Sequence, residues 1–167
     1  MDAEMTKPQF YTIGAYGWTA EHYFAALTSA KIDTFCDIRA RRGVRGSEYA
    51  FVNSTRLQNE LTMLGIIYMH FPDLAPSKEI RNRQFAEDKA ARIAKRKRTE
   101  LGYEFASGYR DTILTNFISS DFVASLPEGT KRIVLFCVER EPSACHRSLL
   151  AARLEKDLGI SVTHLLP

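Results

Sequence analysis

The stretch Arg132–Leu154, RIVLFCVEREPSACHRSLLAARL, predicts a strand, a turn and a helix in close succession. It opens with the apolar run Ile133–Val138, which predicts a buried strand. Glu139–Glu141 form a polar turn, and Pro142 opens a segment in which leucines recur every four residues until Gly159. Proline at the first helical position and glycine after the last are common helix boundaries, so a helix is expected between them.

The rest of the chain repeats this alternation of strand and helix. The predicted order is β-α-β-α-β, then a long helical stretch over residues 74–126, then β-α-β. It predicts an α/β fold: a single-domain three-layer sandwich with a mostly parallel sheet, helices on both faces and a helical insert before the fourth strand. We expect one domain over residues 1–167, with residues 1–8 as a loose tail. The expected strands are 10–13, 34–38, 66–71, 133–138 and 160–165.

Composition limits the class of protein. A chain of 167 residues with 45% hydrophobic residues is long enough to bury a core. It has no apolar run near the roughly 20 residues that span a bilayer and no apolar signal segment at its start, so we expect a cytoplasmic protein with no membrane partner. Three cysteines favour reduced thiols over a disulfide framework. The net charge of +3 permits an anionic partner without requiring nucleic acid.

Polar residues follow four of the expected strands. In an open α/β sheet, ligands bind at the carboxyl ends of the strands, so these residues are candidates for one site. The residues at the strand ends are Gly14, Asp37, Arg39, His70, Cys137 and Glu139.

The start of the last helix adds two candidates. At about 100° per residue, Arg147 falls within the stripe of leucines and His146 lies beside it, whereas Cys145 falls on the opposite side. Arg147 at a helix N-terminus suits a phosphate or carboxylate. An internal pair of Arg147 with Glu139 or Asp37 is the alternative.

Three residues are the candidates for catalysis. His146 can move a proton near neutral pH, and Glu139 can orient it or act beside it. Cys137 ends a strand close to a cation and a helix N-terminus, which lower the pKa of a thiol, although buried strand cysteines are often structural. The ligand-binding candidates are Gly14, Asp37, Arg39, His70 and Arg147.

The segment CVEREPSACHRSLLA, residues 137–151, resembles the signature of the DUF488 family, in which a strand ends in Cys-x-Glu and Cys-His-Arg opens a helix. Thr12–Gly14, Asp37–Arg39 and Ile66–His70 are similar to further pieces of the family pattern. The family commonly has a polar residue such as His after its first glycine, and here Ala15 stands in that place. The family name denotes a domain of unknown function, so the resemblance implies a fold and site positions without a reaction.

Three functions are consistent with the sequence. The first is an enzyme, a hydrolase or transferase without a cofactor, that binds a phosphate-bearing or other anionic small molecule or nucleotide at the carboxyl edge of the sheet. The second is a nucleic-acid-binding module that uses the basic loop 41–45 and a basic helix over 92–98. The third is a zinc-bound or thiol-sensing regulatory protein.

The zinc hypothesis needs four ligands, for which Cys137, Cys145, His146 and His70 are the candidates. The expected direction of Cys145, away from His146, argues against this set. We therefore expect no tightly bound metal.

Overall fold

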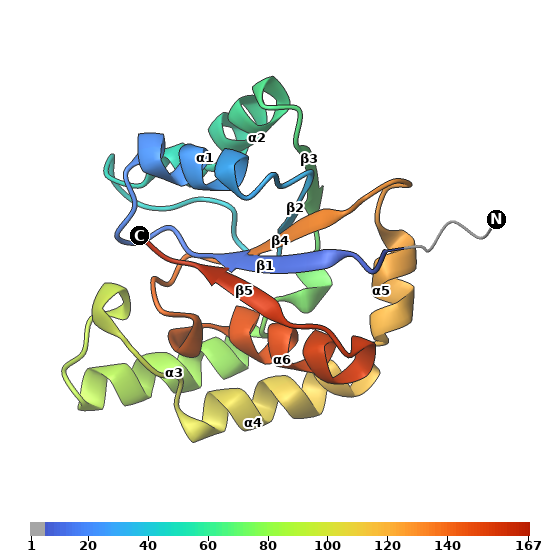
Figure 1. The fold of residues 1–167 in the computed structure, drawn as a ribbon. Helices are drawn as coiled ribbons and strands as arrows, with labels where there is room; N and C mark the ends of the chain where they lie inside the picture. The colour runs from blue at the N-terminus through green and yellow to red at the C-terminus, as the bar shows by residue number, and fades with distance from the viewer. Residues whose placement is uncertain (1–5) are drawn as a thin grey trace.

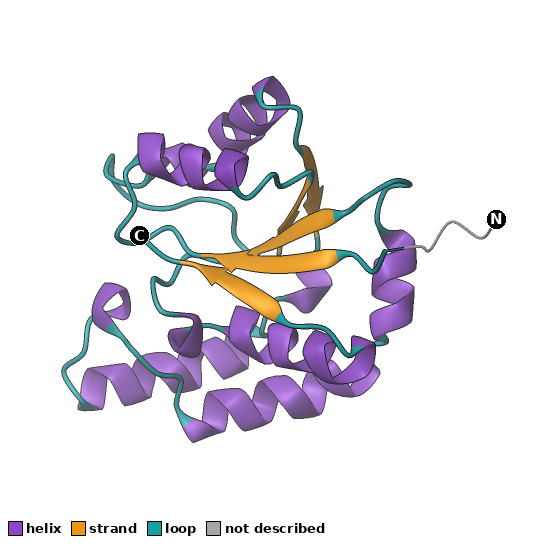
Figure 2. Ribbon diagram, viewed as in Figure 1, coloured by secondary structure: helices purple, strands orange, loops and turns teal. Residues whose placement is uncertain are grey.

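The computed structural model describes residues 6–167. Within them a five-stranded sheet has the order β3-β2-β4-β1-β5, and every pair of neighbouring strands is parallel. The expected α/β architecture is therefore confirmed, with strands close to the expected positions (Figure 2). The strands are β1 (Gln9–Ile13), β2 (Thr34–Asp37), β3 (Ile67–His70), β4 (Arg132–Phe136) and β5 (Val162–Leu165).

Helices cover both faces of this sheet, as the sequence predicts (Figure 1). On one face lie α1 (Ala20–Ser29) and α2 (Ser54–Met63). The other face carries α3 (Lys78–Ala90), α4 (Tyr103–Thr112) and α6 (His146–Leu158). With α5 (Ser119–Ser125), which packs beside α6, α3 and α4 form the expected helical insert between β3 and β4.

The carboxyl ends of the strands lie level with one another. Phe136 at the end of β4 pairs with Ile13 of β1 on one side and with Asp37 of β2 on the other. The connection through α1 leads from β1 to β2, whereas the connection through α6 leads from β4 to β5 in the opposite direction across the sheet. Connections that diverge in this way leave a crevice beyond the strand ends, where ligands bind in open α/β sheets.

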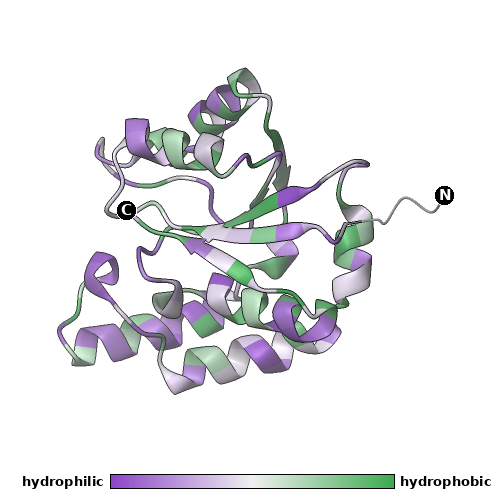
Figure 3. Cartoon of the chain, in the orientation of Figure 1, coloured by the Kyte–Doolittle hydropathy of each residue, from purple (hydrophilic) through white to green (hydrophobic). Residues whose placement is uncertain are grey.

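The core lies between the sheet and its helices. Strand residues are predominantly hydrophobic, whereas α3 and the turn after it carry mainly hydrophilic residues (Figure 3). Phe136 is fully buried and its ring packs against those of Phe35 and Tyr23. No helix in residues 6–167 is long and apolar enough to cross a membrane.

The start of the last helix differs from the sequence prediction. Pro142–Ala144 form a single 3₁₀ turn, Cys145 is extended with φ −140° and ψ 146°, and α6 begins only at His146. Its end at Gly159 is confirmed, because this glycine has the left-handed φ of 63° that commonly ends a helix.

The prediction of a basic helix over residues 92–98 is wrong. The helix α3 ends at Ala90, Arg92 has a φ of 58°, and only Lys95–Lys97 form a short 3₁₀ turn. Such a positive φ interrupts helical geometry, and Arg98 then turns inward to a buried ion pair with Asp88 at 2.7 Å.

Of the expected N-terminal tail, residues 1–8, the first five residues lie outside the described part of the chain. Residues 6–8 belong to no helix or strand, yet Nζ of Lys7 donates a hydrogen bond to the carbonyl of Leu158 at 3.0 Å. This described part of the expected tail therefore has a contact with the folded chain.

Candidate functional site

A pocket of about 680 Å³ opens at the carboxyl ends of β2 and β4. Its walls come from the loop after β2, from α3 and from the segment that joins α3 to α4. The turn between β4 and α6 supplies its base. Four polar residues of that turn line the pocket: Cys137, Glu139, Cys145 and His146.

Basic side chains dominate this pocket. Glu139 is the one carboxylate that lines it among the described residues. Of the basic side chains, Arg41, Arg45, Lys78 and Arg81 have no ion pair within residues 6–167. The pocket therefore carries an excess of positive charge, which favours an anionic ligand. The basic residues are Arg39, Arg41, Arg45, Lys78, Arg81, Lys95, Arg96 and Arg98.

Arg39 is held rigidly at the pocket. Its Nε and Nη2 donate to the two carboxylate oxygens of Asp37, each at 2.8 Å, and its guanidinium lies 4.6 Å from the centre of the Phe136 ring. Burial works to lower the pKa of Arg39, but Asp37 holds it above its ordinary value. Its buried Nη1 has no hydrogen-bond acceptor among residues 6–167. This rigid guanidinium therefore has one donor without a partner within the described residues.

Asp37 and His70, two expected ligand-binding residues, do not line the pocket. Asp37 is fully buried and accepts a hydrogen bond from the Tyr68 hydroxyl at 2.7 Å, and burial together with this carboxylate raises the pKa of Tyr68 to about 12. Nε2 of His70 lies 2.7 Å from the carbonyl oxygen of Arg39. Both residues therefore hold Arg39 in place.

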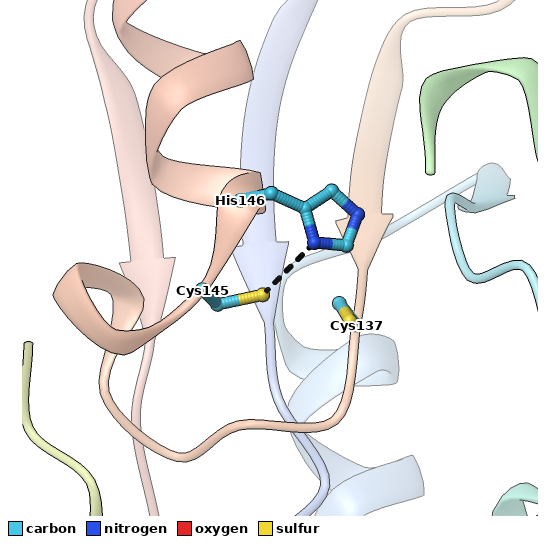
Figure 4. Close-up of side chains that lie close together, drawn as sticks. All are labelled: Cys137, Cys145 and His146. Carbon is cyan, nitrogen blue, oxygen red and sulfur yellow. Dashed lines mark hydrogen bonds between the residues drawn. The ribbon is translucent and has the colours of Figure 1, made fainter. Parts of the chain in front are cut away.

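Cys145 lies inside the site, so its expected direction away from His146 is wrong. Its Sγ is 3.8 Å from Nδ1 of His146, and both side chains approach Cys137 at the end of β4 (Figure 4). The helical angle of 100° per residue does not apply, because Cys145 is the extended residue that precedes the helix. The other ring nitrogen of His146, Nε2, lies 3.0 Å from the carbonyl oxygen of Ile38.

Charges within this turn shift the pKa values of its groups. Burial alone would raise the pKa of Cys145, but a hydrogen bond from Cys137 and the charge of His146 lower it well below its usual range. Burial alone would lower the pKa of His146, and Cys145 raises it. The hydrogen bond to Cys145 and burial raise the pKa of Cys137, and burial together with Cys145 raises that of Glu139.

Arg147, the expected anion ligand, is fully buried and does not line the pocket. Its Nη1 donates to the carbonyl of Glu139 at 2.5 Å and its Nη2 to that of Arg140 at 3.0 Å, while Nε lies 3.4 Å from Oγ1 of Thr12. Neither the expected anion nor the alternative carboxylate partner is needed, because backbone carbonyls of the turn accept the hydrogen bonds of the guanidinium. Arg147 therefore fixes the path of the turn.

Gly14 also serves this turn and does not line the pocket. A Cβ atom at this position would collide with the carbonyl group of Glu139. The glycine is required because the backbone of the turn passes directly over the end of β1. Of the residues expected to share the crevice, Arg39, Cys137, Glu139 and His146 do so, whereas Gly14, Asp37, His70 and Arg147 support them.

Sequence reasoning missed the cations that surround Glu139. Arg98 is buried and donates to the carboxylates of Asp88 at 2.7 Å and Glu139 at 3.2 Å, and also to the carbonyl of Ala144. Lys95 lies 3.7 Å from Glu139, whose charge raises the pKa of Lys95 against the opposing effect of burial. Nothing in the local sequence distinguishes Arg98 from its basic neighbours. Sequence reasoning also left Cys145 out of the candidate site. The signal that could have found it is its position next to His146 in the sequence.

Fold and site together define a parallel α/β protein with a basic pocket over a strand-end cluster of cysteine, histidine and glutamate. The family model described as domain of unknown function DUF488 matches residues 19–154. The chain therefore belongs to the DUF488 family. No match to the chain is found among curated proteins or among solved structures.

Proposed function

We propose that this protein is an enzyme of the hydrolase or transferase class that acts on a phosphate-bearing substrate. The substrate binds in the basic pocket, and its reacting group reaches the cluster of Cys137, Glu139, Cys145 and His146. These residues offer thiol, carboxyl and imidazole groups, which are the groups that activate nucleophiles and move protons in such reactions.

The observation that carries this proposal is the charge of the pocket. Among residues 6–167, eight basic side chains and one carboxylate line the pocket, together with the cysteines and histidine of the cluster. Half of these cations have no ion pair among residues 6–167, and Nη1 of the buried Arg39 lacks an acceptor there. Cations that line a partly enclosed site attract phosphate groups more strongly than cations on an open surface do.

Nucleic-acid binding is the second candidate. Two basic segments of the chain lie together at the pocket, since Nη1 of Arg96 pairs with Glu48 at 3.2 Å and Nη2 lies 3.4 Å from the carbonyl of Arg45. A single basic face is the requirement for contact with a phosphate backbone. The same face would then bind a single strand of nucleic acid along the rim of the pocket.

The test measures binding of pyrophosphate, a panel of nucleoside diphosphates and a short single-stranded oligonucleotide. Binding is measured by thermal shift and by calorimetry. We expect pyrophosphate or a nucleotide to stabilise the protein. The double substitution Arg41→Ala with Arg45→Ala should weaken this binding roughly tenfold, about 1.4 kcal/mol. The matched control is Lys131→Ala, because Lys131 is an exposed cation beside the amino end of β4, away from the pocket.

Two results would contradict the proposal. In the first, none of the phosphate ligands binds to the folded protein. In the second, the control weakens binding as much as the double substitution, so that the attraction is a property of the net charge. Binding of the oligonucleotide alone, with a steep dependence on salt, would favour the second candidate.

A further inference from the structure

Cys137, Cys145 and His146, called here the thiol cluster, present three metal-binding atoms to one another. All three atoms lie within 4.8 Å of one another, and the side chains are buried (Figure 4). The sequence predicts no tightly bound metal, because helical periodicity directs Cys145 away from His146. The structure removes that reason.

One separation in the cluster matches the size of a zinc site, and the others are at most 4.8 Å. Zinc binds thiolate sulfur at about 2.3 Å and imidazole nitrogen at about 2.0 Å in tetrahedral geometry, which sets neighbouring ligand atoms roughly 3.5–3.8 Å apart. The separation of Cys145 Sγ from His146 Nδ1 is 3.8 Å. Two soft thiolates with one imidazole select zinc over magnesium or calcium, which prefer oxygen ligands.

The hydrogen bond of His146 to the backbone is compatible with a metal ligand. Its Nε2 lies 3.0 Å from the carbonyl oxygen of Ile38, and a carbonyl can only accept. Nε2 therefore carries a proton, and Nδ1, which lies 3.8 Å from Cys145 Sγ, is the ring nitrogen that would bind a metal once it has lost its own proton. Histidines that bind metals usually donate their second ring N–H in this way to a backbone carbonyl or a carboxylate.

The backbone holds the cluster in place. Cys137 directly follows β4, and Cys145 is the extended residue directly before the first turn of α6. Lys95 and Arg98 both pair with Glu139, whose Oε2 lies 3.4 Å from the sulfur of Cys137. His70 does not complete the set, because its Nε2 lies against the carbonyl oxygen of Arg39. Three protein ligands leave a fourth position, the arrangement typical of catalytic zinc.

We propose that Cys137, Cys145 and His146 bind one zinc ion whose fourth position faces the basic pocket. Glu139 stands beside that position, with Oε2 3.4 Å from the sulfur of Cys137, and is placed to exchange a proton with a group bound there. Zinc binding is independent of the proposed function. Its role in catalysis rests on that function, since it requires the substrate to enter the pocket.

The test begins with zinc content, measured by elemental analysis of tag-free protein purified without chelators. We expect close to one zinc per chain in the wild type and in Cys36→Ser. Cys36 is the matched control, because it is a buried cysteine of β2 outside the cluster. Cys137→Ser, Cys145→Ser and His146→Gln should each bind zinc at least tenfold more weakly after stripping and titration against a competing chelator.

Two further measurements keep the test decisive if a variant fails to fold. Cobalt added to the stripped wild type should give the visible absorption of a tetrahedral ion and the sulfur-to-metal band of bound thiolate. Zinc should also protect Cys145 from alkylation by iodoacetamide. Absent cobalt–thiolate bands would overturn the proposal. Alkylation of Cys145 that proceeds in the stripped protein and is just as fast with zinc bound would overturn it too, and would leave the cysteine as a free nucleophile.

The same samples separate this inference from the proposed function. Pyrophosphate binding is measured on the zinc-loaded protein. Zinc retained with no pyrophosphate binding contradicts the proposed function and leaves the metal site standing. The opposite result is a wild type that binds pyrophosphate but binds zinc no more tightly than Cys145→Ser does. It would contradict the metal site and leave the proposed function standing.

Discussion

Replacing Arg147 by methionine distinguishes a residue that binds ligand from one that holds the fold. Methionine keeps the length and the apolar stem of the side chain but removes its donors. The guanidinium donates to the carbonyls of Glu139 at 2.5 Å and Arg140 at 3.0 Å and is fully buried. We therefore expect Arg147→Met to destabilise the protein without weakening anion binding.

The magnitude follows from the bonds that are lost. Two carbonyl groups lose a charged donor, and each buried group left unsatisfied costs about 1–3 kcal/mol. Removing a buried charge returns part of that cost. The net loss should be about 3 kcal/mol. For a chain of this length each kcal/mol lowers Tm by roughly 2–4 °C, so a fall of about 6–12 °C is expected.

The assay pairs thermal and urea unfolding, followed by circular dichroism, with pyrophosphate titration of the folded variant. Lys156→Met is the control, since Lys156 is an exposed cation on the same helix and should leave Tm unchanged. A variant that melts with the wild type but no longer binds pyrophosphate would refute the reasoning and return Arg147 to the ligand site.

Three further substitutions test other parts of the argument. Gly14→Ala should cost about 1–3 kcal/mol in urea unfolding, because its Cβ meets the Glu139 backbone, whereas Gly43→Ala, with nothing near its Cβ, should be neutral. Arg39→Lys should keep the charge yet weaken pyrophosphate binding in calorimetry by roughly tenfold, because lysine lacks the fork that Asp37 fixes. His164→Asn should flatten the pH dependence of stability. Burial and Arg147 lower the pKa of His164, so the unfolded chain binds the proton first and stability falls as pH drops below about 6.5; urea midpoints at about pH 7 and pH 5 measure this. Equal midpoint differences in wild type and variant would contradict the role of His164.

The order of the elements was predictable because each strand carries its own apolar run. Ile133–Val138 must be buried whatever surrounds it, and the end of the last helix follows from the left-handed conformation of Gly159. The start of that helix was less predictable. Pro142 suits both a 3₁₀ turn and an α-helix, and only tertiary contacts select between them.

The candidate site was predictable only in part, for the same physical reason. Strand ends converge by topology, which brings Arg39, Cys137 and Glu139 together as expected. The direction of Cys145 depends on one residue adopting an extended conformation before the helix. The burial of Arg98 depends on Asp88, ten positions away on another element. Periodicity describes regular elements, and both residues lie where regularity stops.

The buried ion pairs of Arg98 connect the insert to the chemistry of the site. Arg98 reaches Asp88 on α3, the carboxylate of Glu139 and the carbonyl of Ala144 in the turn before α6. A single guanidinium therefore joins a wall of the pocket to its base. Because a buried carboxylate left unpaired is costly, the insert cannot move away without disturbing Glu139. The cations that attract a substrate and the carboxylate beside the thiol cluster are thus held in one unit, and substrate binding and chemistry are expected to depend on the same network.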